Sequence, residues 1–440
     1  MIQKQLSLLG DCITTYKGEG VLTLKDGFSV PCIFEAGQLK QGDIFLFCDC
    51  SALTVSTFFT PAHKFEGTTT QGYTFASIDN FIQIDSEAGT HVYLLRSGTV
   101  RVAEQTLPQS VRYGVTNLII EHPLRIQVNH KGMIQQLVIK PVHNHETIMW
   151  CVRRLKSIDV TCEIVGEVTS ETGKEILEEV VDNICYLLSV AKGTKIEWLY
   201  LDIFDAQGTC TERMHGSRIT KTYCPFSLID EDRILQAFLE KTYNPYVTNR
   251  ERYALNQGAI DTYLDAKAES DYLQVRGIKL AVAMEVLKDV FLNLSDRRVE
   301  EFVTKPNRFN KKIISELEGE ILSILRKNNR DITAKTLSEK LPDLNRRTFR
   351  EILDDIFKQI DLQLTEEDTQ SFIQSRNSLV HKGRFKSEEK SREVENIQPL
   401  IEEFCFLMSV LDKVFLRLLE YHGQYVDRRV PNQPNRYAQI

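Results

Sequence analysis

The chain has 440 residues, of which 42% are hydrophobic and 26% are charged, a composition typical of globular proteins rather than disordered chains. Its net charge of −7 at pH 7 excludes a surface coated with basic charge for bulk nucleic-acid binding, although a local basic groove could still bind phosphate. At roughly 100–200 residues per domain, we expect two or three domains.

The N-terminus and the cysteines indicate the compartment. MIQKQLSLLGDCITTY lacks the basic region and long apolar segment of a signal peptide. No stretch approaches the roughly 18–20 apolar residues that span a bilayer. The ten cysteines are scattered, most of them in apolar runs such as FLFCDC and FCFLM, as reduced core residues are. We therefore expect a cytoplasmic protein without membrane contact.

The first third of the chain has the pattern of short β-strands. Runs rich in β-branched and aromatic residues are separated by the turn-like sequences KDG, QG, SG and NHKG. These runs are GVLTL, SVPCIFEA, DIFLFCDC, FIQIDS, THVYLL, LRIQV and IQQLVIK. Many short strands at close spacing predict a β-sandwich or a curved sheet.

One helix is expected inside this β-rich region. SETGKEILEEVVDNICYLLSVAKG has Ser170 or Thr172 near its start, apolar residues at helical spacing, and Gly193 as its stop. KIEWLYLDIFDA, residues 195–206, then has the pattern of a strand. We therefore assign residues 1–225 to one N-terminal unit.

From residue 226 onward the pattern is helical. Helices are expected at RILQAFLEKTYNPY, NQGAIDTYLDAKA, 272–294, in shorter pieces between 311 and 360, at 366–382 and at 393–421. The expected fold class is α+β: a β-rich domain (sandwich or curved sheet plus a helix) at 1–225, followed by an all-α helical bundle at 226–425. Residues 426–440 are polar, contain two prolines and form a C-terminal tail.

The segment TEEDTQSFIQSRNSLVHKG has the signals of a complete helix. Thr365 can cap its N-terminus, and the acidic residues that follow suit the positive end of the helix dipole. Gly383 suits the left-handed conformation that ends many helices. Phe372, Ile373, Leu379 and Val380 form the expected buried stripe.

Arg376 falls inside that buried stripe, which is unusual because a buried guanidinium needs anionic or hydrogen-bonding partners. Asn377 and His381 are four residues apart and share a neighbouring face. On an ideal helix Arg376 and His381 are about 140° apart, so one regular helix would not aim both at one point. A long arginine side chain, irregular geometry before Gly383, or a second subunit would be needed.

Two interpretations of these residues stay open from spacing alone. In the structural one, Arg376 is a core salt-bridge residue, His381 interacts with the helix dipole, and Asn377 is solvated. In the functional one, the residues carry a reaction. Glu285, which interrupts the apolar run IKLAVAMEVL, is a candidate partner for Arg376, or else a carboxylate at a helix edge.

The C-terminal half resembles HEPN domains, in particular those of the ApeA-like group. Many HEPN domains are ribonucleases with an Arg-x4–6-His signature, matched here by Arg376-Asn377-Ser378-Leu379-Val380-His381 before Lys382-Gly383. ESDYLQVRGIKLAVAMEVL resembles their long early helix, and LDKVFLRLLEYHGQY their closing helix. The resemblance covers residues 228–425, and DNICYLLSVAKG and HGSRITKTYCPF resemble the N-terminal region of ApeA-like proteins more weakly.

The resemblance implies a metal-independent RNA endonuclease without cofactors that acts as a homodimer, with Arg and His of both subunits lining one cleft. An RNA 2′-OH would attack the adjacent phosphate. His381 would act as the general base or acid, and Arg376 would stabilise the phosphoryl charge. Asn377 would orient the phosphate or the histidine, and Glu285 would support the site.

The implied biology is anti-phage abortive infection by blocking translation, with an RNA substrate for which tRNA is one candidate. The β-rich domain would sense a phage-derived trigger or restrain the nuclease. A non-catalytic HEPN binding or dimerisation module, a toxin of a toxin–antitoxin pair, and a nucleotidyltransferase partner or antitoxin-like module are the alternatives.

Basic segments could hold the RNA, or could be solvated loops and helix ends. They are KGRFK (with Lys382, Arg384 and Lys386), NRFNKK, RKNNR and NRR, and KGRFK is favoured because it adjoins the motif.

Other candidate sites have weak support in the sequence. The possible metal pairs His143/His145 and Cys48/Cys50 each lack a second pair at zinc-finger spacing. Cys210 and Cys224 with His215 are only slightly better candidates for binding a metal, so no metal site is expected. No nucleotide-binding glycine motif is present. DITAKTLSEKLPDLNRRTFREIL could be a helix-turn-helix, but inserted bundle helices are favoured.

Overall fold

The computed structural model describes residues 12–40, 42–50, 61–78, 81–87, 90–95, 97–102, 108–155, 157–168, 171–216, 223–268, 271–294, 300–304, 309, 313–327, 341–389, 397–429 and 437–440. The chain divides into two compact units. The first comprises residues 1–247 with the short segments 267–269 and 423–426, and the second comprises the remaining residues.

The first unit is built on an antiparallel β-sheet, so the predicted β-rich region is confirmed. Its strands are β1 (Cys12–Leu24), β2 (Ser29–Leu39), β3 (Ile44–Asp49), β4 (Ala62–Thr69), β5 (Thr74–Ile78), β6 (Ile82–Glu87), β7 (Thr90–Leu95), β8 (Ser97–Arg101), β9 (Ser110–Thr116), β10 (Leu124–His130), β11 (Met133–Pro141), β12 (Val160–Glu167), β13 (Trp198–Phe204) and β14 (Cys210–Gly216). In the part of the chain that is described, they form one 14-stranded sheet in the order β10-β11-β12-β9-β13-β14-β8-β5-β4-β1-β2-β3-β7-β6. Strands distant in sequence therefore become neighbours, such as β14 and β8.

Aromatic rings pack beneath glycines in the centre of this sheet. The rings of Phe34 and Phe65 lie 4.9 Å apart, edge to face, inside the core of β1–β5. A Cβ atom on Gly20 would lie 2.6 Å from the Phe65 ring, and one on Gly67 would lie 2.6 Å from the Phe34 ring. Glycine is therefore required at both positions for these rings to reach the backbone.

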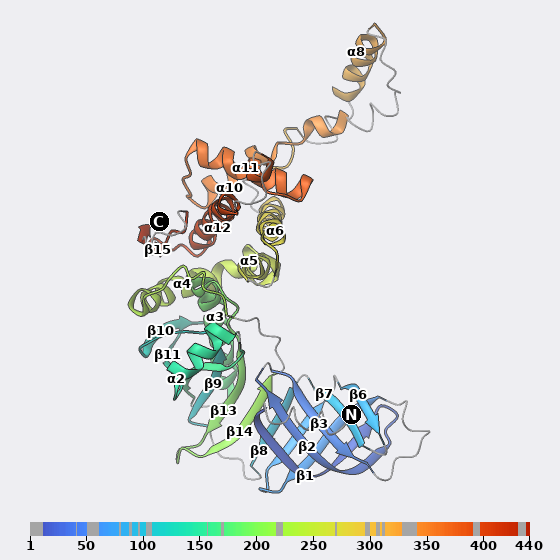
Figure 1. The fold of residues 1–440 in the computed structure, drawn as a ribbon, viewed down its shortest axis with the longest axis vertical. Helices are drawn as coiled ribbons and strands as arrows, with labels where there is room; N and C mark the ends of the chain where they lie inside the picture. Colours follow the sequence, from blue (N-terminus) through green and yellow to red (C-terminus); the bar gives the residue numbers. More distant parts are fainter. Residues whose placement is uncertain are drawn as a thin grey trace. The chain divides into compact units, whose positions relative to one another are not determined.

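Helix α3 (Glu171–Lys192) is the helix expected within the β-rich region, and Gly193 follows it with φ of 64°. The indole N–H of Trp198 on β13 donates a 2.8 Å hydrogen bond to Asp182 of α3. A Cβ atom on Gly166 of β12 would lie 2.7 Å from Leu177 of α3. The helix therefore packs closely on β12 and β13 (Figure 1).

The first compact unit extends beyond residue 225, where the sequence places the domain boundary. Helix α4 (Asp232–Arg252) begins inside this unit, and the Asp232 carboxylate accepts 2.9 Å hydrogen bonds from the backbone N–H groups of Glu121 and His122. The Tyr243 hydroxyl lies 2.9 Å from Nδ1 of His130. These contacts attach the first turns of α4 to the β-rich unit.

Helices dominate the later part of the chain, so the mixed α+β class is confirmed. The remaining elements are α2 (His145–Trp150), the π-helices Cys151–Leu155 and Leu255–Ala259, α5 (Ile260–Lys267), α6 (Leu273–Leu292), α8 (Ile314–Lys327), the 3₁₀ turns Leu341–Asn345 and Ser387–Glu389, α10 (Phe349–Gln359), α11 (Glu366–Lys382), α12 (Gln398–Leu418), β15 (Gln424–Val426) and β16 (Tyr437–Gln439). Helices α10, α11 and α12 each pack against α6 (Figure 1). Among the described residues, no helix combines the length and apolar character needed to cross a bilayer.

Candidate functional site

Helix α11 carries the Arg-x4-His motif, and its ends are those that the sequence predicts. The Thr365 hydroxyl accepts a 3.0 Å hydrogen bond from the backbone N–H of Asp368, which caps the N-terminus. At the other end Gly383 adopts φ of 68°, and its N–H donates to the carbonyl of Leu379 at 3.0 Å. The motif therefore lies on one continuous helix that runs from cap to cap.

The buried stripe of α11 is shorter than expected. Phe372, Ile373 and Leu379 are buried, but Val380 is 41% exposed and does not belong to the stripe. The Leu379 side chain packs against α6 at Gly277. Val380 lies about 100° further around the axis of α11, so its side chain points away from this contact.

Arg376 lies on the buried side of α11 and has partners from three helices. Its guanidinium forms an ion pair with Glu285 of α6. The sequence suggests this pair, because both charged residues interrupt apolar helical segments. It also donates from Nη1 to the side-chain oxygen of Asn377 at 2.7 Å, and its Cζ lies 4.5 Å from the ring centroid of Phe349 on α10. The Arg376 side chain is only 12% exposed, so these contacts fix the direction of its charge.

A second cation completes the ion-pair group. The other carboxylate oxygen of Glu285 lies 2.6 Å from the ammonium of Lys288, one turn further along α6. Partial burial alone would lower the pKa of Lys288, but the hydrogen bond from its ammonium to Glu285 and the nearby carboxylates outweigh burial and raise that pKa. Glu285 is therefore a carboxylate shared between two cations.

Local packing fixes the segment that follows the motif. Phe385 is fully buried, and a Cβ atom on Gly277 of α6 would lie 2.7 Å from its ring. The Glu403 carboxylate of α12 accepts backbone hydrogen bonds from Lys386 at 3.0 Å and Ser387 at 2.8 Å. The glycine on α6 thus lets Phe385 anchor KGRFK against the helices.

His381 occupies the last turn of α11, and its side chain is exposed. Because the helix is continuous, five residues of rotation place His381 about 140° around the axis from Arg376 and about 7.5 Å along it. Within one chain the structure therefore brings Arg376, Asn377 and Glu285 together, but leaves His381 on a different side of the helix.

The basic residues expected at an RNA-binding rim have different surroundings. Lys382 and Arg384 are exposed, and Lys386 is half-buried with its ammonium hydrogen-bonded to Gln374. Two of the other basic segments, NRFNKK and RKNNR, lie largely outside the described residues, as does the first part of the helix-turn-helix candidate. In NRR, Arg347 forms a 2.5 Å ion pair with Asp355.

Two members of the Arg376 environment are not anticipated from the sequence. Lys288 is three residues from Glu285, a spacing at which side chains on a helix meet, so its role could have been found. Phe349 gives no such signal, because only the packing of α10 brings it to Arg376. Among the described residues, no group of three or more His, Cys, Asp or Glu side chains is arranged to hold a metal ion.

Comparison with known proteins gives no match to a family model, a curated protein or a solved structure. The resemblance to HEPN domains therefore rests on the motif and its two flanking helices.

Proposed function

We propose that this chain is a metal-independent RNA endonuclease of the HEPN type, and that it acts as an anti-phage abortive-infection effector in the cytoplasm. The observation that carries the proposal is the position of Arg376. Its charged group lies on the inner side of α11, is directed by Glu285, Asn377 and Phe349, and is five residues from an exposed histidine.

Arg376 is suited to bind a phosphoryl group. A guanidinium has five N–H donors, and the hydrogen bonds to Glu285 and Asn377 use two of them. A phosphate oxygen is a strong acceptor, and a pre-positioned arginine binds it without losing side-chain freedom at that moment. The carboxylate of Glu285 keeps the guanidinium in place while no phosphate is bound.

The reaction proposed is transesterification within the RNA. His381 takes the proton from a 2′-OH, and the 2′-oxygen attacks the adjacent phosphorus. The bond from phosphorus to the 5′-oxygen of the next nucleotide breaks, and that oxygen is protonated. The products are a 2′,3′-cyclic phosphate and a 5′-OH, and Arg376 stabilises the negative charge that develops on the phosphoryl oxygens.

Purified wild type, Arg376→Ala and Arg376→Lys incubated with total RNA in EDTA test this proposal. Wild type should produce fragments with cyclic-phosphate ends, and Arg376→Ala should not. Arg376→Lys should restore little of the cleavage activity, because an ammonium lacks the planar pair of N–H donors that a guanidinium has. Strict dependence on added metal, or 5′-phosphate products, would overturn the mechanism.

The second part of the proposal is a homodimer whose site combines residues of two copies. It is supported by the rotation of about 140° between Arg376 and His381, which keeps the two apart within one copy. Mixing inactive Arg376→Ala with inactive His381→Ala should restore part of the activity, because a mixed dimer has one intact Arg–His pair across its subunits. The shared site would be contradicted if mixtures that exchange subunits recovered no activity, or if an active monomer eluted in gel filtration.

The same rotation favours one competing function, a non-catalytic HEPN module in which the Arg376–Glu285 pair only stabilises the helices. That module would bind or dimerise normally and leave RNA intact in the assay above.

For the β-rich unit we propose the sensing of a phage-derived trigger.

A further inference from the structure

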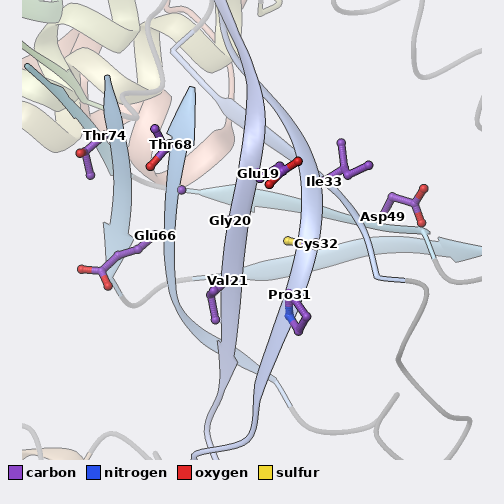
Figure 2. A pocket seen from close by; sticks show the side chains of 11 residues that line it. Glu19, Gly20, Val21, Pro31, Cys32, Ile33, Asp49, Glu66, Thr68 and Thr74 are labelled. Atoms are coloured by element: carbon purple, nitrogen blue, oxygen red, sulfur yellow. The ribbon is translucent and has the colours of Figure 1, made fainter. Parts of the chain in front are cut away.

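The outer face of the N-terminal sheet has a pocket with no role in the nuclease proposal. Its volume is about 700 Å³, and its lining includes Glu19, Val21, Ile33, Asp49 and Glu66. Figure 2 shows the carboxylates of Glu66 and Asp49 on opposite sides of the two central strands, which carry Val21 and Ile33. We call this surface the Ile33 pocket.

Strand register explains why these side chains meet. Asp49 on β3 is paired with Ile33 on β2, Ile33 with Glu19 on β1, and Glu19 with Thr68 on β4. Two residues along β1, Val21 is paired with Glu66 on β4. Alternate residues of a strand face the same side, so these residues form two adjacent rows on one face of the sheet.

The centre of the Ile33 pocket is apolar and open to solvent. Ile33 is 64% exposed and Val21 is 42% exposed, on a face whose opposite side packs the Phe34 and Phe65 rings beneath Gly20 and Gly67. The two side chains are diagonal neighbours on β1 and β2, and their removal from water would favour association with a partner. The sheet beneath them gives a rigid base.

The charge of the Ile33 pocket is of one sign. Three carboxylates line it, from Glu19, Asp49 and Glu66, and its lining residues include no Lys, Arg or His. Glu66 has a 3.0 Å ion pair with Lys64, while neither Glu19 nor Asp49 forms an ion pair with another described residue. Such a field repels a phosphate backbone and attracts basic side chains.

The spacing of the outer carboxylates suits an extended peptide. Asp49 and Glu66 lie three strand intervals apart, about 14 Å, and two residues apart along the strands, about 7 Å, so about 16 Å separates them. Residues i and i+4 of an extended chain are about 14 Å apart and face the same side, with residue i+2 between them, and the long side chains of Lys and Arg span the difference. A basic–apolar–basic pattern at i, i+2 and i+4 would therefore match Asp49, the Ile33 and Val21 centre, and Glu66.

We propose that the Ile33 pocket binds an extended segment of a partner protein in which two Lys or Arg residues flank an apolar residue at every second position. The inference does not depend on the nuclease proposal, because peptide binding is measured without RNA.

Fluorescence anisotropy of a labelled Lys-Ser-Ile-Ser-Lys peptide with the full-length protein tests the inference. We expect saturable binding that weakens with added salt. Glu-Ser-Ile-Ser-Glu, Lys-Ser-Ser-Ser-Lys and the respaced Lys-Lys-Ile-Ser-Ser should each bind several-fold more weakly. The double variant Asp49→Asn/Glu66→Gln should weaken binding about threefold or more, the range expected for two exposed ion pairs.

Ile33→Ser should also weaken binding, and Ile134→Ser is its matched control, because Ile134 on β11 is 62% exposed but lies outside the pocket. The inference is overturned by an absence of binding up to about 1 mM peptide, by equal binding of the glutamate peptide, or by equal losses in the two isoleucine variants. RNA binding that is lost in Ile33→Ser and strengthened in the double charge variant would assign the face to nucleic acid instead.

Discussion

The guanidinium of Arg376 on α11 forms an ion pair with the carboxylate of Glu285 on α6, 91 residues earlier in the chain. Both side chains are largely buried, and Lys288 holds the second oxygen of the same carboxylate. This contact joins two helices and directs the charge that we assign to phosphate binding, so its removal should affect both stability and activity.

Glu285→Gln should lower the free energy of unfolding of the helical unit by about 1–3 kcal/mol. The reason is that Arg376, only 12% exposed, would lose its anionic partner and keep its charge. Urea denaturation followed by far-ultraviolet circular dichroism measures the change. Glu320→Gln, at an exposed position of α8, is the matched control and should shift stability by less than about 0.5 kcal/mol. Equal stability of the two variants would mean that the ion pair does not hold the helices.

Gly277→Ala should destabilise the helical unit by about 1–3 kcal/mol, because the new methyl group would lie 2.7 Å from the buried Phe385 ring. Gly319→Ala on α8 is the control, since nothing lies within 4 Å of its added Cβ. That control should stabilise its helix by about 0.5–1 kcal/mol. Thermal unfolding measures both, and a neutral or stabilising Gly277→Ala would argue against close packing of Phe385 on α6.

His215 should make the β-rich unit less stable in mild acid. Burial and the charge of Arg213 lower the pKa of His215 from 6.5 to about 3. The unfolded chain therefore takes up this proton first, and stability is lost as the pH falls from about 6.5 towards 3. Between pH 7 and pH 5 the histidine alone should cost about 2 kcal/mol.

Tryptophan fluorescence reports this loss, because both tryptophans, Trp150 and Trp198, lie in the first compact unit. His215→Gln should flatten the pH dependence of the urea midpoint, whereas His122→Gln, at an exposed position, should leave it unchanged. An identical pH dependence in wild type and His215→Gln would contradict a buried neutral imidazole that hydrogen-bonds Tyr16 and Gln38.

Features with local causes could be predicted from the sequence. The bounds of α11 follow from Thr365 and Gly383, whose effects act within one turn. The Arg376–Glu285 pair was predictable because a charge on an apolar helix face requires a partner. The order of the strands was not, since it depends on pairings such as β14 with β8, more than a hundred residues apart.

Strand β4 could not be predicted from the sequence, because its composition gives a weak strand signal. Strand β4, AHKFEGTT, buries Ala62, Phe65, Gly67 and Thr69, and a register shift near its start interrupts the alternation between Ala62 and Phe65. Two of these buried residues, Ala62 and Gly67, are small and give little hydrophobic signal. The contact of Phe349 with Arg376 depends on where α10 packs, which no local pattern specifies. The Ile33 pocket likewise arises from the register of four strands, and no single strand encodes it.

The most direct test of the central claim is the rate of RNA cleavage by purified wild type and His381→Ala in EDTA. We predict that wild type cleaves RNA and that the variant is slower by about 10²–10⁴-fold, the usual cost of losing a general acid or base. His381 is exposed, so the variant should fold normally and give the wild-type circular dichroism spectrum. Cleavage by His381→Ala at the wild-type rate, or no cleavage of any RNA by the wild-type protein, would contradict the account.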